Sequence, residues 1–171
     1  MKLSPDYIAG FVDGEGCFAL KFRKDKKLNR TNTPEYFRWS VEFAIVLRSD
    51  DREILEFIKE TLDCGNISLT KDRNQVRYYI QDTEKLKKII VPFFNTNRLY
   101  GKKHNDFCLW SEAVEIIYRN KRKSINIKKG KRGFTENNWN PNDLKRLKEI
   151  HNEMRPIKSK VKNWKWLEQS T

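Results

Sequence analysis

Two acidic residues near the N-terminus stand among glycines in a pattern that suits metal binding. Residues 8–16 read Ile-Ala-Gly-Phe-Val-Asp-Gly-Glu-Gly, so the two acids are Asp13 and Glu15. Ser4 can cap a helix and Pro5 suits the first helical position, so the segment is predicted to be a short helix that ends in a glycine-rich turn. Glu15 then lies at the end of that helix, where a carboxylate is a natural ligand for a divalent metal.

The spacing of two glycines in this segment indicates how the helix packs. Gly10 and Gly14 are four residues apart and therefore share one face of the helix. A face of small residues lets another helix approach backbone to backbone. A carboxylate at the seam of two such helices can meet its counterpart from the partner helix, and the pair forms a cradle for metal. The alternative is an ordinary amphipathic helix that ends at a glycine cap.

Residues 8–16 resemble the signature of the LAGLIDADG homing endonucleases, with Glu15 where Asp is usual. The resemblance implies a metal-dependent, site-specific endonuclease that cuts double-stranded DNA, is encoded in an intron and uses Mg²⁺ or Mn²⁺. Because the motif occurs once in the sequence, the resemblance also implies a homodimer, with no small-molecule substrate. Two alternatives stay open. One is a non-cleaving nucleic-acid binder on the same fold, such as an intron RNA maturase or a regulator, and the other is a basic structural protein that carries the motif by chance.

The resemblance assigns roles to the residues of the motif. The Glu15 carboxylate and the backbone carbonyl of Gly14 are the implied metal ligands of the catalytic site. Asp13 is implied to cap a helix N-terminus of the partner subunit, and direct metal ligation is its alternative role. The residues implied at the dimer interface are Ala9, Gly10, Asp13 and Gly14.

Two further parts of the catalytic site follow from the same resemblance. A catalytic lysine is implied just before the helix after the second hairpin, where the chain has Lys102 and Lys103, and Lys102 is preferred. His104 beside them is either a general base or a surface residue. The glutamine that often orders water at the end of the second strand is replaced here by Leu47, so Arg48 or Ser49 would have to take its place.

The elements that must hold these residues are predicted from apolar periodicity and from cap and turn residues. They are a helix before Gly16, strands over 17–23 and 36–48, a helix from Ser49, hairpin strands over 66–71 and 75–81, a helix from Thr83 that Pro92 should kink or end, and a helix over about 103–120. This α-β-β-α-β-β-α order fits an α+β LAGLIDADG domain with a curved antiparallel sheet over residues 1–120.

One face of the predicted sheet carries polar side chains suited to reading DNA. These candidates are Lys21, Arg23, Arg38, Ser40, Glu42, Ser68, Thr70, Arg77, Tyr79 and Gln81. In the major groove Arg and Lys suit guanine, Gln suits adenine, and Glu42 can accept from N4 of cytosine. Contacts to phosphates are expected from Lys24, Lys26, Lys27 and Arg30 in and before the loop that follows the first strand.

The C-terminal part, residues 121–171, is predicted to be a basic extension with one helix that starts at Asn140 and Pro141. Lysines and arginines crowd residues 121–139, and Trp164 and Trp166 stand among basic residues near the end. The tail is either a solvated appendage, a contact to the DNA backbone or a segment that docks on the core.

Composition limits the partners of the chain. The 171 residues carry a net charge of +13 and the pI is about 9.7, which favours a polyanion, and nucleic acid above all. No apolar run reaches membrane-spanning length, and a secretory signal is absent. The three cysteines form no C-x-x-C pair, which argues against a zinc site and favours a reducing interior. We therefore expect an intracellular protein, in an organelle (chloroplast or mitochondrion) or in a prokaryotic cytoplasm.

Overall fold

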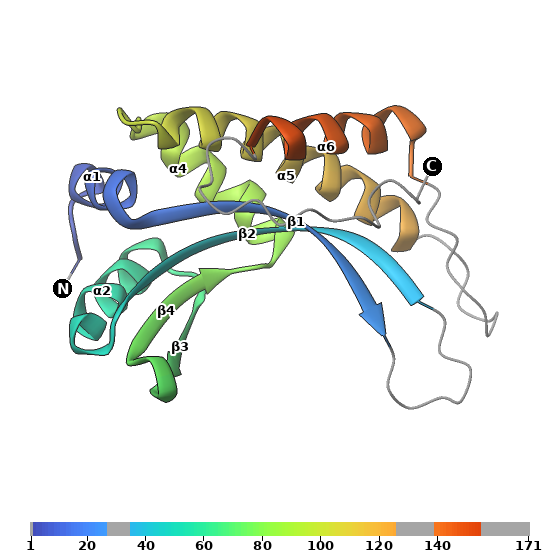
Figure 1. The fold of residues 1–171 in the computed structure, drawn as a ribbon. Helices are drawn as coiled ribbons and strands as arrows, with labels where there is room; N and C mark the ends of the chain where they lie inside the picture. Colours follow the sequence, from blue (N-terminus) through green and yellow to red (C-terminus); the bar gives the residue numbers. More distant parts are fainter. Residues whose placement is uncertain (1, 27–34, 126–138, 155–171) are drawn as a thin grey trace.

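Helices and strands follow the predicted α-β-β-α-β-β-α order, and two more helices come after it in the described residues (Figure 1). The structure, a computed structural model, describes residues 2–26, 35–125 and 139–154. The elements are α1 (Pro5–Glu15), β1 (Gly16–Lys26), β2 (Glu35–Arg48), η1 (Ser49–Asp51), α2 (Arg52–Leu62), β3 (Asn66–Thr70), η2 (Lys71–Arg73), β4 (Gln75–Ile80), α3 (Thr83–Lys85), η3 (Leu86–Ile90), α4 (Val91–Thr96), α5 (Lys103–Ile125) and α6 (Pro141–Met154). The predicted fold class is confirmed.

Both ends of α1 are set by the residues that the sequence singled out. The Ser4 hydroxyl accepts a hydrogen bond of 3.2 Å from the backbone N–H of Tyr7, and Pro5 occupies the first turn. At the other end the chain passes from helix to strand without a loop. A Cβ on Gly16 would lie 2.5 Å from the side chain of Val12, so this sharp transition requires glycine.

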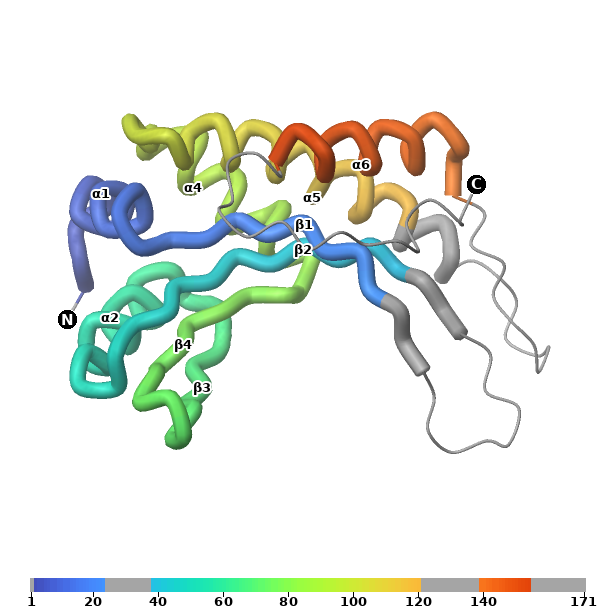
Figure 2. Tube along the Cα trace, viewed as in Figure 1, coloured from blue at the N-terminus to red at the C-terminus, as the bar shows by residue number. Residues whose placement is uncertain are grey.

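The four strands form one antiparallel sheet in the order β1-β2-β4-β3. Figures 1 and 2 show β1 and β2 as long, arched strands, with α5 and α6 above them. Residues that face each other across a pair share one side of the sheet. Phe18 is paired with Phe43 on the core side, whereas Lys21 is paired with Ser40 on the opposite side. The period-two pattern in the sequence therefore predicted both faces.

Phe18 lies at the centre of the hydrophobic core. Its ring centroid is 5.3 Å from Phe43, 5.6 Å from Phe94, 5.4 Å from Phe107 and 5.0 Å from Trp110. These rings come from β2, α4 and α5, and each is almost completely buried. Each aromatic pair adds about 0.5–1.5 kcal/mol beyond the burial of its area. This cluster holds β1, and with it the chain that follows the acidic motif, against the helices.

The helical segment that contains Pro92 does not end early, so of the two predicted outcomes, a kink or an early end, the early end is wrong. Helical structure is continuous from α3 through η3 to α4, and η3 is a π-helix. Pro92 stands in the first turn of α4. Because proline has no N–H to donate, we attribute the wider π turn to accommodation of the missing bond.

The last helix, α6, docks on α5 through a buried carboxylate. Asp143 accepts hydrogen bonds from the guanidinium of Arg119, at 3.0 Å from Nε and also from Nη2, and from the amide of Asn120 at 2.7 Å. Three apolar residues of α6 join the same core as the sheet: Leu147, Ile150 and Met154. The predicted boundary at residue 120 falls inside α5, and the division into two domains stays a prediction. Trp164 and Trp166 lie outside the described residues.

Within the part of the chain that the structure covers, no helix is both long and apolar enough to cross a membrane. The cysteines are free: Cys17 and Cys108 are exposed, and Cys64 is buried.

We expect Asp143→Ala to lower the free energy of unfolding by about 1–3 kcal/mol, because one N–H of the buried Asn120 amide loses its acceptor. Urea unfolding followed by circular dichroism measures the change. Asp72→Ala is the matched control, since Asp72 is exposed on η2 and should change stability by less than about 0.5 kcal/mol. Equal urea midpoints for Asp143→Ala and the unmodified protein would contradict the docking role of this carboxylate.

Candidate active site and nucleic-acid interface

Glu15 is exposed at the C-terminal end of α1, on the rim of a surface hollow. The helix ends there because Gly16 starts β1, so the side chain stands where a helix meets the sheet. The other residues that line the hollow come from the end of β2, from η1 and from the turn into β4: Val46, Leu47, Arg48, Asp51, Arg73, Asn74 and Gln75. The sequence prediction placed Glu15 correctly at the helix end.

A lysine from the start of α5 reaches the backbone beside Glu15. The Nζ atom of Lys103 donates a hydrogen bond of 2.8 Å to the carbonyl of Asp13 and another to the carbonyl of Gly14. Lys102, the residue preferred from the sequence, is exposed on the preceding turn. The structure thus brings Lys103 to the carbonyl that was expected to bind metal, because the first residue of α5 points toward the end of α1.

Asp13 caps a backbone turn of its own chain, and the predicted cap on a partner subunit stays a prediction. Its Oδ2 atom accepts hydrogen bonds from the N–H groups of Tyr100, at 2.8 Å, and Gly101, at 2.7 Å. These amides lie just before α5, where the helix dipole also favours a negative charge. A Cβ on Gly101 would come within 2.9 Å of the carboxylate, so glycine allows this close approach. Asp13 therefore ties α1 to the start of α5.

One face of α1 is open in the single chain. A Cβ added to Gly10 or to Gly14 would meet nothing within 4 Å in the described structure. Tyr7 and Phe11 stack on each other at this surface, with ring centroids 6.1 Å apart. Ala9, in contrast, is buried in its own core. Its assignment to the dimer interface is wrong, because the helical period turns Ala9 inward while it turns the glycines outward.

The second strand runs to Arg48 as predicted, and its last residues alternate between the two sides of the sheet. Leu47 packs against the core, and Val46 is the residue exposed on the polar side. The guanidinium of Arg48 is engaged by Asp50, with its Nε atom 2.7 Å from Oδ1. Gln75, which is paired with Arg48 across β2 and β4, lines the same hollow as Glu15. An amide is thus present near Glu15 after all, and only the pairing of the strands reveals it.

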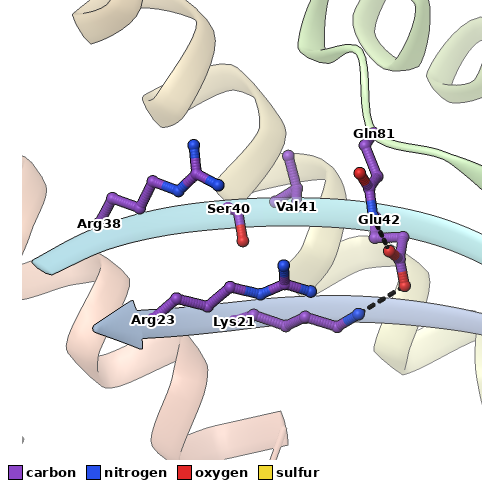
Figure 3. A pocket seen from close by; sticks show the side chains of 7 residues that line it. All are labelled: Lys21, Arg23, Arg38, Ser40, Val41, Glu42 and Gln81. Carbon is purple, nitrogen blue, oxygen red and sulfur yellow. Dashed lines mark hydrogen bonds and ion pairs between the residues drawn. The ribbon is translucent and has the colours of Figure 1, made fainter. Parts of the chain in front are cut away.

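The ten DNA-reading candidates share the side of the sheet that faces away from the core, as predicted. Cross-strand pairs fix this: Arg23 with Arg38, Lys21 with Ser40, and Ser68 with Arg77. Six of the candidates line one hollow together with Val41 (Figure 3): Lys21, Arg23, Arg38, Ser40, Glu42 and Gln81. Lys27 and Arg30 lie outside the described residues, as do the side chains of Lys24 and Lys26.

Glu42 is buried on this polar side, although it was predicted to contact a base. Its carboxylate accepts hydrogen bonds from Lys21 at 2.5 Å, from Arg77 and from Gln81. Burial alone would raise the pKa of Glu42, but the hydrogen bonds from Lys21 and Gln81 and the charges of Lys21 and Arg77 bring it below its ordinary value. Both oxygens are engaged within the chain, so the structure contradicts a free acceptor at this position.

Comparison with known proteins identifies the family. The family model described as LAGLIDADG endonuclease matches residues 8–114. The chain belongs to the LAGLIDADG endonuclease family. The match runs from the acidic motif to the middle of α5, so the resemblance seen in the sequence is confirmed.

Relatives and solved structures agree with this membership. The chain is 32% identical over 127 residues to a "Probable intron-encoded endonuclease 2" of Neurospora crassa, and the match covers 72% of the chain and 26% of that protein. The chain thus spans about a quarter of the length of this relative. The crystal structure of the homing endonuclease I-TnaI matches with a TM-score of 0.70 and 25% identity, over 99% of this chain and 96% of that one.

A second LAGLIDADG fold shows the same architecture. The meganuclease I-SmaMI, solved bound to uncleavable DNA, matches with a TM-score of 0.66 and 22% identity. The match covers 88% of this chain and 44% of that one. At this identity the likeness concerns the fold alone.

The oxygen donors at the end of α1 fit a hard divalent cation. Glu15 offers an exposed carboxylate, and the Gly14 backbone carbonyl beside it is a second oxygen donor, which accepts a hydrogen bond from the Lys103 ammonium in this structure. Across the described ranges, no group of three His, Cys, Asp or Glu residues gathers to hold a metal unaided. Mg²⁺ commonly binds one or two carboxylates, several waters and substrate phosphates. One carboxylate and one carbonyl suit that mode of binding.

We expect Asp13→Ala to lower the free energy of unfolding by about 1–2 kcal/mol, as loss of a helix cap does. Asp13→Asn keeps one oxygen for the N–H groups of Tyr100 and Gly101, so it should cost less. Thermal and urea unfolding of the two variants, measured in parallel, test whether Asp13→Ala loses more stability than Asp13→Asn. The cap is not important for stability if Asp13→Ala is as stable as the unmodified protein.

Proposed function

We propose that this chain is a metal-dependent endonuclease that cuts double-stranded DNA at a specific site, acts as a homodimer and is encoded in an intron. The observation that carries the proposal is the arrangement at the end of α1. There Glu15 is exposed beside the Gly14 carbonyl, and Lys103 reaches that carbonyl from α5. The names of the relatives, which are probable intron-encoded endonucleases, support the same activity.

The polar side of the sheet supports recognition of duplex DNA. A curved antiparallel sheet can enter the major groove and present alternate side chains to base edges. Lys21, Arg23, Arg38 and Arg77 give that side donors for bases and phosphates. The net charge of +13 adds attraction to the phosphate backbone.

Cleavage of a phosphodiester bond would give each group of this site a separate role. A divalent cation such as Mg²⁺, when bound, supplies Lewis acidity and activates water. Glu15 and the Gly14 carbonyl would hold it. The Lys103 ammonium lies where it can stabilise negative charge that develops on a phosphate, and the Asp13 cap keeps the start of α5, and so Lys103, next to α1.

The open face of α1 supports the homodimer. Gly10 and Gly14 allow a second α1 to approach closely, and Tyr7 and Phe11 add apolar area to the contact. In such a pair the two Glu15 side chains would lie near the symmetry axis, one for each DNA strand.

The maturase alternative gains no support from the relatives, whose names are those of probable intron-encoded endonucleases. The expected compartment, an organelle or a prokaryotic cytoplasm, stays a prediction.

The proposed activity is tested by incubating the protein with a library of duplexes, with Mg²⁺ or with Ca²⁺. We expect discrete cuts with Mg²⁺, and a loss of cleavage rate of about 100-fold or more in Glu15→Gln and in Lys103→Met, as removal of one transition-state contact causes. Duplex binding in Ca²⁺ should persist in both variants. Lys102→Met is the matched control and should cut almost normally. Unchanged cleavage by Glu15→Gln would remove this residue from the mechanism.

The proposed dimer is tested by Gly10→Leu. Leucine favours a helix over glycine by about 1 kcal/mol, and the site is open in the single chain, so the folded subunit should keep or gain stability. The added side chain should nevertheless separate the two α1 helices and give monomers in sedimentation equilibrium. Lys145→Leu, at an exposed position on α6, controls for the new apolar surface. A monomeric unmodified protein, or a Gly10→Leu dimer, would refute this interface.

A further inference from the structure

We propose that Glu42 is a positioning residue for DNA recognition: its buried carboxylate fixes the orientation of Lys21, Arg77 and Gln81, which read the bases, and it touches no base itself. The inference rests on the proposed DNA-binding function. It deepens that function by naming the group on which sequence discrimination depends.

The first support is the burial of an acid on a side of the sheet that otherwise carries exposed polar groups. The Glu42 side chain is only 3% exposed, whereas those of Lys21 and Arg77 are 32% and 34% exposed. The two cations therefore cover the carboxylate and keep their own surfaces toward the solvent. A group that is covered in this way cannot reach a base edge before its partners move.

The second support is that both carboxylate oxygens already have donors. Oε1 accepts from Lys21, at 2.5 Å, and from Arg77, and Oε2 accepts from Gln81. Figure 3 shows Lys21 and Gln81 pointing to the carboxylate from opposite sides. To accept from cytosine N4, Glu42 would have to give up one of these charge-assisted or amide bonds. Both oxygens therefore already accept hydrogen bonds from within the protein.

The third support is that the donors reach Glu42 from both strands that flank β2. Lys21 is on β1, Arg77 is on β4 and Gln81 follows β4, while Glu42 itself is on β2. Arg77 is held a second time, since its guanidinium lies 5.2 Å from the ring centroid of Tyr79. One carboxylate thus orders long side chains that would otherwise sample many rotamers, and such ordering before binding improves discrimination between partners.

Charge explains why an acid is compatible with this surface. An unpaired carboxylate would repel the phosphates of a duplex. Here one anion contacts two cations, so the cluster keeps a net positive charge. The negative charge of Glu42 weakens the electrostatic attraction to any DNA, while its hydrogen bonds hold the three donors in place. Its removal should therefore act in opposite directions on general and on sequence-specific binding.

The test measures binding to a library of duplexes in Ca²⁺ for the unmodified protein, Glu42→Gln and Glu42→Asp. We expect Glu42→Gln to bind random duplex as tightly as the unmodified protein or more tightly, and to lose about tenfold or more in discrimination at several base pairs. Glu42→Asp keeps the charge but has a shorter reach, so it should not restore discrimination. Glu115→Gln, which makes the same charge change on α5, should leave discrimination unchanged.

A double-mutant cycle of Glu42→Gln with Lys21→Met provides a second readout, and Lys21→Met alone tests the cluster if a Glu42 variant folds poorly. Lys21→Met should lose discrimination at a subset of the base pairs that Glu42→Gln affects, and the two losses should not add. Loss at one base pair only would instead identify Glu42 as a direct base contact. Unchanged discrimination together with tighter binding to every duplex would show that Glu42 only repels the DNA phosphates. Each of these two results would overturn the inference. A protein that selects no sequence even when unmodified refutes the proposed function itself, and the inference falls with it.

Discussion

The end of α1 is bonded to the start of α5, and the arrangement of the site depends on this connection. The Asp13 carboxylate accepts from two backbone amides before α5, and the Lys103 ammonium returns to the carbonyls of Asp13 and Gly14. Glycine at position 16 then lets the chain leave the helix at once into β1. These bonds and the tight turn at Gly16 fix the backbone on both sides of Glu15. Its side chain is therefore held exposed where the helix meets the sheet.

Two of the buried acids, Asp143 and Glu42, each hold several donors in place. Asp143 holds α6 against α5 through Arg119 and Asn120. Glu42 gathers donors on the opposite side of the sheet. In each case the carboxylate is buried among cations and amides, which is the condition under which a charge is tolerated away from water. In a chain with many lysines and arginines, a buried acid therefore indicates which of these side chains are held in a fixed orientation.

Much of the fold could be predicted from the sequence, because strand and helix periods are local properties. Phe18, Leu20 and Phe22 alternate with other residues in the sequence, and all three are buried on the core side of β1. Ser4 and Pro5 indicated the start of α1. Errors arose where distant segments meet. Only the contact between α1 and α5 shows that Lys103 rather than Lys102 reaches Gly14.

Strand pairing accounts for the remaining differences in the site. The pairing of β2 with β4 brings Gln75 beside Arg48 on the polar side of the sheet, whereas Leu47 faces the core. The same pairing, together with that of β1, encloses Glu42 between Lys21 and Arg77. A list of polar residues on one face carries no information about which of them bind each other. For this reason the face was predicted correctly while the role of its central acid was not.

The exposed glycine face of α1 has a consequence for the symmetry of recognition. Two identical subunits joined there by a twofold axis would present the same side chains to both strands, so their preferred sequence would be a palindrome or close to one. Any substitution on the sheet would then alter both half-sites at once. Fusion of two diverged copies into a single polypeptide would lift that restriction and let each half evolve its own preference.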